Sequence, residues 1–179
     1  MDKFRHGLGL IVVMLLGLCP SPRLRARLLS ILGASIGRNV RICPCRIINL
    51  RKGFRNLRVG SDVHIGTDCL IDLEGPVVIS KGTTIAPRVV LLSHSDPGAS
   101  HESPLILQFP PTSEGLYIGM DCWIGANCTL LDGSHIGDYC VIAAATVVRG
   151  NLESGFLYGG APARKIRPLL PAQENSGPN

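Results

Sequence analysis

The chain has 179 residues, enough for one domain with a substantial core, and a formal net charge of +5. Aromatic residues make up only 4% of it, whereas Gly and Pro number 21 and 13, which disfavours a globule built on large aromatic side chains and favours many small stacked turns. Seven cysteines invite a disulfide or zinc interpretation, but no Cys-x-x-Cys pair occurs, so the sequence predicts no metal site.

Positive charge is concentrated at the N-terminal end. Residues 1–58 contain twelve Lys and Arg and one acid, Asp2, whereas the rest of the chain contains six basic and twelve acidic residues. Such a basic segment favours an anionic lipid surface or a phosphorylated acceptor as partner. Nucleic acid is the rival partner, but the chain has no helix-turn-helix, RNA-binding or zinc-finger motif and few aromatic residues to stack on bases. The sequence therefore predicts no nucleic-acid binding.

An apolar run extends from Leu8 to Cys19, after Lys3 and Arg5. It is shorter than the roughly 20 residues that span a bilayer, and no signal-peptide cleavage site follows it. Residues 23–32 then mix cations with apolar residues at helical spacing, which is typical of an element lying in a membrane interface. Residues 1–33 are thus predicted to be helical and peripheral on the cytoplasmic face of the cell membrane. The alternative is a helix that packs on its own domain or on a neighbouring subunit.

A period of six dominates the rest of the sequence. Every sixth residue over one long stretch is aliphatic: Ile118, Ile124, Leu130, Ile136, Ile142 and Val148. A small residue stands two positions before many of the repeated aliphatics, and four cysteines predicted to point inward occupy this position: Cys69, Cys122, Cys128 and Cys140. This period fits neither a helix nor a simple strand. It indicates a short strand and a turn, stacked three to a coil of about 18 residues.

The period breaks in three places. Residues 49–58 are basic and irregular, residues 74–76 bring a two-residue slip, and a long segment over 93–117 separates Leu91 from Ile118. Because a regular solenoid that ejects a long loop usually does so for function, the loop 93–117 is predicted to border the active site. The repeat domain is assigned to residues 34–168, and residues 169–179 to a disordered tail.

The repeat region resembles the hexapeptide-repeat acyltransferases, which include galactoside and maltose O-acetyltransferases and the O-acetyltransferases of capsule and lipopolysaccharide assembly. The matching segments are Ile85–His94, Ile118–Asn127, Ile136–Ala145 and Gly159–Arg167. The segment Ile71–Pro76 makes the surface-polysaccharide branch the most similar one. The resemblance implies an all-β, left-handed parallel β-helix, a homotrimer with active sites between subunits, and acetyl-coenzyme A as co-substrate.

His94 is the predicted general base. Imidazole titrates near neutral pH, which suits removal of a proton from an attacking hydroxyl. Of the five histidines, His94 alone combines the mouth of the loop with a family motif, and His101 within the loop is the second candidate. Asp96 is near in sequence, and is a candidate both for orienting the imidazole and for contacting the acceptor.

The resemblance also implies a site for the coenzyme. Three cations near the C-terminus are expected to meet its phosphates: Arg164, Lys165 and Arg167. Four residues of the repeats are expected to line its groove: Trp123, Gly125, Ala126 and Ala144. The backbone N–H of Gly125 is in addition a candidate donor to the oxyanion of acyl transfer. Asp72 and Glu74 are candidates for binding the acceptor, although either could be a turn carboxylate that bonds nearby amides.

Together these features predict an acetyl-coenzyme A-dependent O-acetyltransferase that acts on a sugar or glycolipid precursor. One alternative is an N-acetyltransferase of a nucleotide-linked amino sugar. A non-enzymatic β-helix that scaffolds partners is the other.

Overall fold

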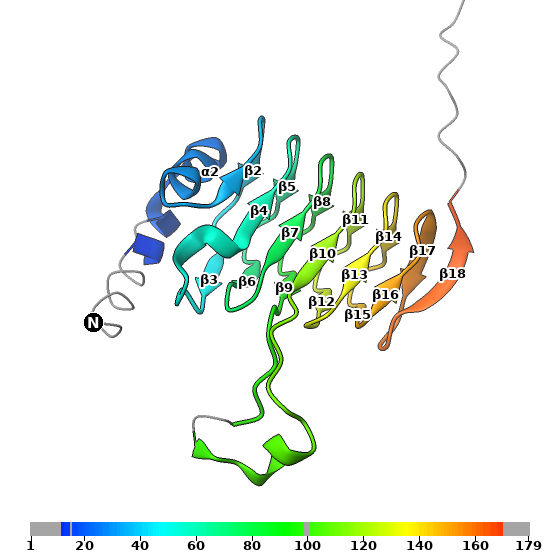
Figure 1. Cartoon of the computed structure of the whole chain (residues 1–179). Coiled ribbons are helices and arrows are strands. Elements are labelled where there is room, and N and C mark those ends of the chain that lie inside the picture. Colours follow the sequence, from blue (N-terminus) through cyan, green and yellow to red (C-terminus); the bar gives the residue numbers. More distant parts are fainter. Residues whose placement is uncertain (1–11, 15, 99–100, 170–179) are drawn as a thin grey trace, which may run out of the picture.

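The computed structural model describes residues 12–14, 16–98 and 101–169 (Figure 1). The predicted tail therefore lies outside the described residues from position 170 on, as does the start of the apolar run, Leu8 to Ile11.

Three parallel sheets wind around one axis (Figure 1). Sheet A contains β1 (Ser35–Ile36), β4 (Leu57–Val59), β7 (Val77–Ile79), β10 (Leu116–Ile118), β13 (His135–Ile136) and β16 (Asn151–Leu152). Sheet B contains β2 (Arg41–Ile42), β5 (His64–Ile65), β8 (Thr84–Ile85), β11 (Trp123–Ile124), β14 (Val141–Ile142), β17 (Phe156–Gly159) and β18 (Arg164–Pro168). Sheet C contains β3 (Arg46–Ile48), β6 (Leu70–Asp72), β9 (Val90–Leu91), β12 (Thr129–Leu130) and β15 (Val147–Val148). Each of the first five coils contributes one strand to each sheet, which confirms the predicted parallel β-helix.

The repeated aliphatic side chains form the core. In sheet B, Ile65 pairs with Ile85, Ile85 with Ile124 and Ile124 with Ile142, so that identical side chains stack from coil to coil. All six residues of the long period are at most 1% exposed. The four cysteines predicted to point inward are at most 2% exposed, and no disulfide is formed among the described residues. The period of six was therefore a correct guide to the interior.

A helix closes the N-terminal end of the solenoid. Helix α2 (Pro22–Ile31) starts after Ser21, whose hydroxyl accepts a hydrogen bond from the backbone N of Leu24, and it packs on β1 and β2. Residues 12–14 and 16–18 are also helical. None of the helices within the described residues combines the length and the apolar character needed to cross a membrane.

Two further segments depart from the regular coil. Between β9 and β10 the chain leaves the solenoid as a long arm, which contains the short helix η3 (Pro104–Leu107) and reaches away from the body (Figure 1). At the other irregular stretch, residues 49–58, the short helix η1 (Gly53–Asn56) buries Phe54 against the core. At the C-terminal end β18 turns back and pairs antiparallel with β17.

Candidate active site

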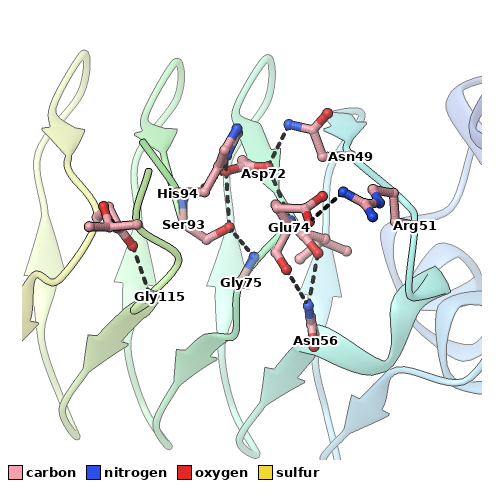
Figure 2. A network of polar contacts seen from close by, with 12 residues as sticks. Asn49, Arg51, Asn56, Asp72, Glu74, Gly75, Ser93, His94 and Gly115 are labelled. Atoms are coloured by element: carbon pink, nitrogen blue, oxygen red, sulfur yellow. Dashed lines mark hydrogen bonds and ion pairs between the residues drawn. The ribbon is translucent and has the colours of Figure 1, made fainter. Parts of the chain in front are cut away.

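The three breaks in the period lie at one corner of the solenoid, where the chain passes from sheet C to sheet A. Asn49 follows β3, Asp72 ends β6 and His94 follows β9, and these strands are neighbours in sheet C. Segments that are far apart in the sequence are thereby stacked in space. Figure 2 shows their side chains gathered in one polar network.

A histidine–aspartate pair lies at the centre of this network. Nδ1 of His94 is 2.5 Å from Oδ2 of Asp72. The side chain of Asp72 is fully buried, whereas that of His94 is 28% exposed. The imidazole thus has one nitrogen anchored in the protein while part of the ring is accessible from outside.

Both oxygens of the Asp72 carboxylate accept hydrogen bonds. Oδ1 accepts from Nδ2 of Asn49 at 2.8 Å and from the backbone N of Glu74 at 3.2 Å. Oδ2 accepts from the backbone N of Ser93 at 2.9 Å and from its hydroxyl at 3.0 Å, in addition to its contact with His94. Burial raises the pKa of Asp72, but these hydrogen bonds outweigh it and keep the pKa below its ordinary value. Asp72 is therefore ionised at neutral pH.

The ionised carboxylate decides the tautomer of His94. An ionised carboxylate can only accept hydrogen bonds, so Nδ1 of the ring must carry a hydrogen. In the neutral imidazole this leaves the lone pair on Nε2, the nitrogen that a proton acceptor needs. The partner predicted for this role was Asp96, but Oδ1 of Asp96 accepts from the backbone N of Gly98 at 2.9 Å, and Asp72 is the carboxylate that contacts the ring.

Close backbone packing holds the pair in place. The backbone N of Gly75 donates to the hydroxyl of Ser93 at 2.9 Å, and a Cβ at position 75 would lie 2.4 Å from the carbonyl oxygen of Ser93. Nδ2 of Asn56 donates to the carbonyls of Leu73 and Glu74, at 2.9 and 3.0 Å. Only glycine fits at position 75, and the slip around it brings Asp72 and Ser93 together.

The two residues predicted to bind the acceptor have different surroundings. Asp72 is buried and its oxygens are engaged within the chain, so it has no exposed oxygen to offer an acceptor, and that prediction is corrected. Glu74 lies at the same corner, 3.5 Å from Arg51, with 23% of its side chain exposed. Contact between Glu74 and an acceptor stays a prediction.

The root of the long arm is fixed beside His94. Ser95 and Thr112 exchange backbone hydrogen bonds of 3.0 and 2.9 Å across the two branches of the arm. Asp132 then accepts from the hydroxyl of Thr112 at 2.6 Å and from the backbone N of Gly115 at 2.8 Å. These hydrogen bonds join the two branches of the arm to each other and to the solenoid at the point where His94 lies.

The residues predicted to line the coenzyme groove lie on or after sheet B. Trp123 is on β11 with 56% of its surface exposed, and Ala126 and Ala144 follow β11 and β14 in the turns toward sheet C. The N–H of Gly125 donates to the carbonyl of Ile142 at 2.8 Å. The expectation that it would serve an oxyanion is therefore wrong, because this donor is already used between coils.

The three predicted cations share the last strand of sheet B. Arg164, Lys165 and Arg167 all lie on β18 and are exposed. Nζ of Lys165 donates a hydrogen bond of 2.7 Å to Oε2 of Glu153 and lies 4.0 Å from the centre of the Phe156 ring, and the hydrogen bond to Glu153 raises the pKa of Lys165. The structure thus places the cations and Trp123 on one sheet, and His94 at a different corner of the solenoid.

Four side chains of the network were not among the predicted site residues: Asn49, Arg51, Asn56 and Ser93. A signal for them exists in the sequence. Asn49 and Asp72 are 23 positions apart, and Asp72 and His94 are 22 apart, so each stands at the end of its sheet C strand. A comparison of the breaks coil by coil would have predicted that Asn49, Asp72 and His94 lie side by side.

No group of three His, Cys, Asp or Glu side chains suited to a metal ion occurs in the part of the chain that the structure describes.

Comparison with known proteins agrees with this architecture. The family model described as "Bacterial transferase hexapeptide (six repeats)" matches residues 115–150. In sequence, the chain is 32% identical over 118 residues to the Escherichia coli protein named "Putative lipopolysaccharide biosynthesis O-acetyl transferase WbbJ", covering 63% of this chain and 57% of that one. It is 29% identical over 145 residues to "Putative colanic acid biosynthesis acetyltransferase WcaF" of Escherichia coli, covering 81% of this chain and 75% of that one.

A solved structure shows the same fold. It is that of a hexapeptide-repeat-containing acetyltransferase from Vibrio cholerae O1 biovar eltor, complexed with acetyl-coenzyme A. The TM-score is 0.79 at 20% sequence identity, covering 94% of this chain and 89% of that one.

Proposed function

We propose that this chain, which belongs to the hexapeptide-repeat transferase family, transfers an acetyl group from acetyl-coenzyme A to a hydroxyl of a sugar or glycolipid precursor. The observation that carries the proposal is the contact between Nδ1 of His94 and buried, ionised Asp72. The contact leaves Nε2, the nitrogen on the far side of the ring from the carboxylate, as the one that can accept a proton, as general-base catalysis requires.

The roles of the pair follow from their chemistry. Acetyl-coenzyme A supplies the acetyl group as a thioester. Nε2 of His94 accepts the proton of the acceptor hydroxyl as its oxygen bonds to the acetyl carbon, and the carbon–sulfur bond breaks. Asp72 stabilises the imidazolium that forms, and His94 then returns the proton to the departing sulfur. Asp72 positions the base and contacts no reacting atom.

The residues on sheet B suit the coenzyme. The guanidinium groups of Arg164 and Arg167 are exposed on β18 and form no ion pair with any described residue. Guanidinium groups bind phosphate oxygens strongly, and the exposed indole of Trp123 on the same sheet offers an apolar surface. Lys165 is already paired with Glu153 and is expected to contribute less.

The acceptor is inferred from the relatives. The names of the two relatives described above refer to lipopolysaccharide and to colanic acid biosynthesis. This chain spans 57% of the length of the first of them, so its own acceptor is a proposal. A sugar hydroxyl of a surface-polysaccharide precursor is the substrate class that these names favour.

Replacing the base tests the proposal. We expect His94→Ala to lower the rate of acetyl transfer at least about 10²-fold, the contribution typical of a general base. Coenzyme A binding, measured by calorimetry, should be retained, because His94 lies at another corner from the predicted coenzyme residues. The matched control is His135→Ala on β13, whose ring is exposed on sheet A and contacts Tyr117.

Activity of His94→Ala close to that of the unaltered protein would remove His94 from the mechanism. In that case, loss of activity in His101→Ala would identify the second candidate as the base. A panel of hydroxyl and amino-sugar acceptors, analysed by mass spectrometry, separates O-acetylation from N-acetylation. Failure of the unaltered protein to bind coenzyme A would favour the scaffold alternative.

A further inference from the structure

Helix α2 has three faces with different chemistry. Its inner face buries Arg25, Ala26 and Leu29 against the first coil. Its side is basic, and its outer face is apolar. The proposed acetyl-transfer site lies elsewhere on the solenoid and uses neither the basic side nor the apolar outer face of α2.

The outer face is the reverse of what a surface helix normally shows. Leu24 and Ile31 stand seven positions apart on the side of the helix away from the buried residues and are 45% and 81% exposed, whereas Leu28 is partly buried against the core. The preceding helical residues add Met14 and Leu18, which are 67% and 75% exposed. A helix at the surface of a soluble domain usually turns polar side chains outward. This apolar face therefore suits an apolar environment.

A basic cavity lies beside this face. It has a volume of about 340 Å³ and lies between α2 and the turn after β1. Arg23, Arg27 and Ser30 line it from the helix, and Arg38 and Asn39 from the turn. The remaining lining residues are apolar or glycine, so no carboxylate of the described part of the chain lines the cavity.

The three guanidinium groups around the cavity have no acidic partner. No ion pair involving Arg23, Arg27 or Arg38 occurs within residues 12–14, 16–98 and 101–169. Asp62, in the second coil, is engaged elsewhere, since its carboxylate accepts a hydrogen bond from Asn39 at 3.0 Å. Three arginines that line one cavity without a carboxylate partner are complementary to a phosphate group.

We propose that the cavity and the outer face of α2 form one docking site for an anionic phospholipid bilayer. The headgroup phosphate of a lipid is bound between Arg23, Arg27 and Arg38, while Leu24 and Ile31 enter the boundary between headgroups and acyl chains. An apolar face flanked by arginines is the geometry of an interfacial helix, in which cations remain at the level of the lipid phosphates. The bilayer is favoured over a protein partner because every charged residue that lines the cavity is an arginine and the apolar face lies directly beside it.

Vesicle flotation with the full chain tests the phosphate part of the site. We expect the protein to float with vesicles of phosphatidylcholine and phosphatidylglycerol, and not with vesicles of phosphatidylcholine alone. The double variant Arg23→Gln/Arg27→Gln should lower the partition coefficient about 30-fold, from roughly fivefold for each arginine near an anionic surface. The control Arg58→Gln/Lys81→Gln removes the same charge from β4 and from the turn after β7, and should partition like the unaltered protein. Equal losses in the two double variants would mean a diffuse charge effect and would overturn the proposal.

The apolar part of the site has its own test. Leu24→Ser/Ile31→Ser should also lose flotation, because the apolar anchor is removed while all cations are kept. The matched control is Leu105→Ser/Leu107→Ser on the arm, where the two leucines are 52% and 86% exposed. Loss of flotation in this control alone would assign membrane contact to the arm and contradict the proposal.

Two other occupants would be revealed by the same proteins. One outcome is that inorganic phosphate binds in calorimetry, that Arg23→Gln/Arg27→Gln abolishes this binding, and that the protein floats with no vesicle. This result would identify a site for a soluble phosphate and overturn the proposal of a bilayer. A smaller oligomer of Leu24→Ser/Ile31→Ser in analytical ultracentrifugation would identify the face as a contact between copies of this chain, with the same consequence. Neither result depends on acetyl transfer, so the proposed function is tested separately.

Discussion

At the scale of single residues, Asp72 determines which nitrogen of His94 carries the proton. Asn can offer either an amide hydrogen or a carbonyl oxygen to Nδ1, so Asp72→Asn allows the wrong tautomer while the size of the side chain is kept. We expect Asp72→Asn to lower the rate of acetyl transfer at least about 10²-fold. Nitrogen NMR of the imidazole should show hydrogen on Nδ1 in the unaltered protein and a changed tautomer mixture in the variant. An unchanged rate would show that Asp72 is only a structural residue of the corner.

At the scale of elements, α2 serves as the cap of the solenoid. Arg25 is 2% exposed, and its guanidinium donates to the carbonyls of Leu16 at 2.8 Å and Ile42 at 2.6 Å, and to that of Cys19. These bonds join the preceding helical residues, α2 and the first coil. The first coil of the solenoid needs such a cover, because its apolar interior would otherwise face water.

Removing the guanidinium group tests this cap. We expect Arg25→Met to lower the free energy of unfolding by about 2–4 kcal/mol, because three buried carbonyls lose a charged donor. Urea denaturation monitored by circular dichroism measures this free energy of unfolding. The control is Arg27→Met on the same helix, an exposed position where a change within about 0.5 kcal/mol is expected. Equal effects of the two substitutions would refute a specific role for Arg25.

At the scale of the whole molecule, the candidate base and the candidate coenzyme residues do not meet within one chain. His94 lies where sheet C passes to sheet A, whereas Trp123 and the cations of β18 lie on sheet B. The predicted homotrimer would resolve this, since a neighbouring subunit can bring its sheet B to the corner of His94. The proposed active site is then shared between two chains.

Complementation between two inactive variants tests a shared site. His94→Ala and Arg164→Ala/Arg167→Ala should each have low activity. When the two variants are co-expressed and their subunits mix at random, about a quarter of the sites should combine an intact His94 with intact arginines and regain activity. Analytical ultracentrifugation should show trimers for all proteins. Activity in the mixture no higher than the mean of the two variants would show that each site belongs to a single chain.

The fold could be predicted from the sequence because it repeats. A period of six fixes which side chains point inward, and every coil repeats the same local rule, so Ile118 and Ile142 were assigned to the core without knowledge of any long-range contact. His94 was predicted for a related reason, since it stands where the repeat ends and the arm begins, together with its place in a family motif. The inward cysteines were likewise identified by their place in the repeat.

The partners of His94 were decided by the tertiary structure. Asp96 is two positions away in the sequence, but Asp72 is one coil away in space, and stacking of coils brings the second and not the first to the ring. The use of the Gly125 N–H between coils and the burial of the Asp72 carboxylate have the same origin. Local sequence specifies the path of each coil, whereas hydrogen-bond partners depend on which turns lie side by side, and the breaks in the repeat shift that alignment.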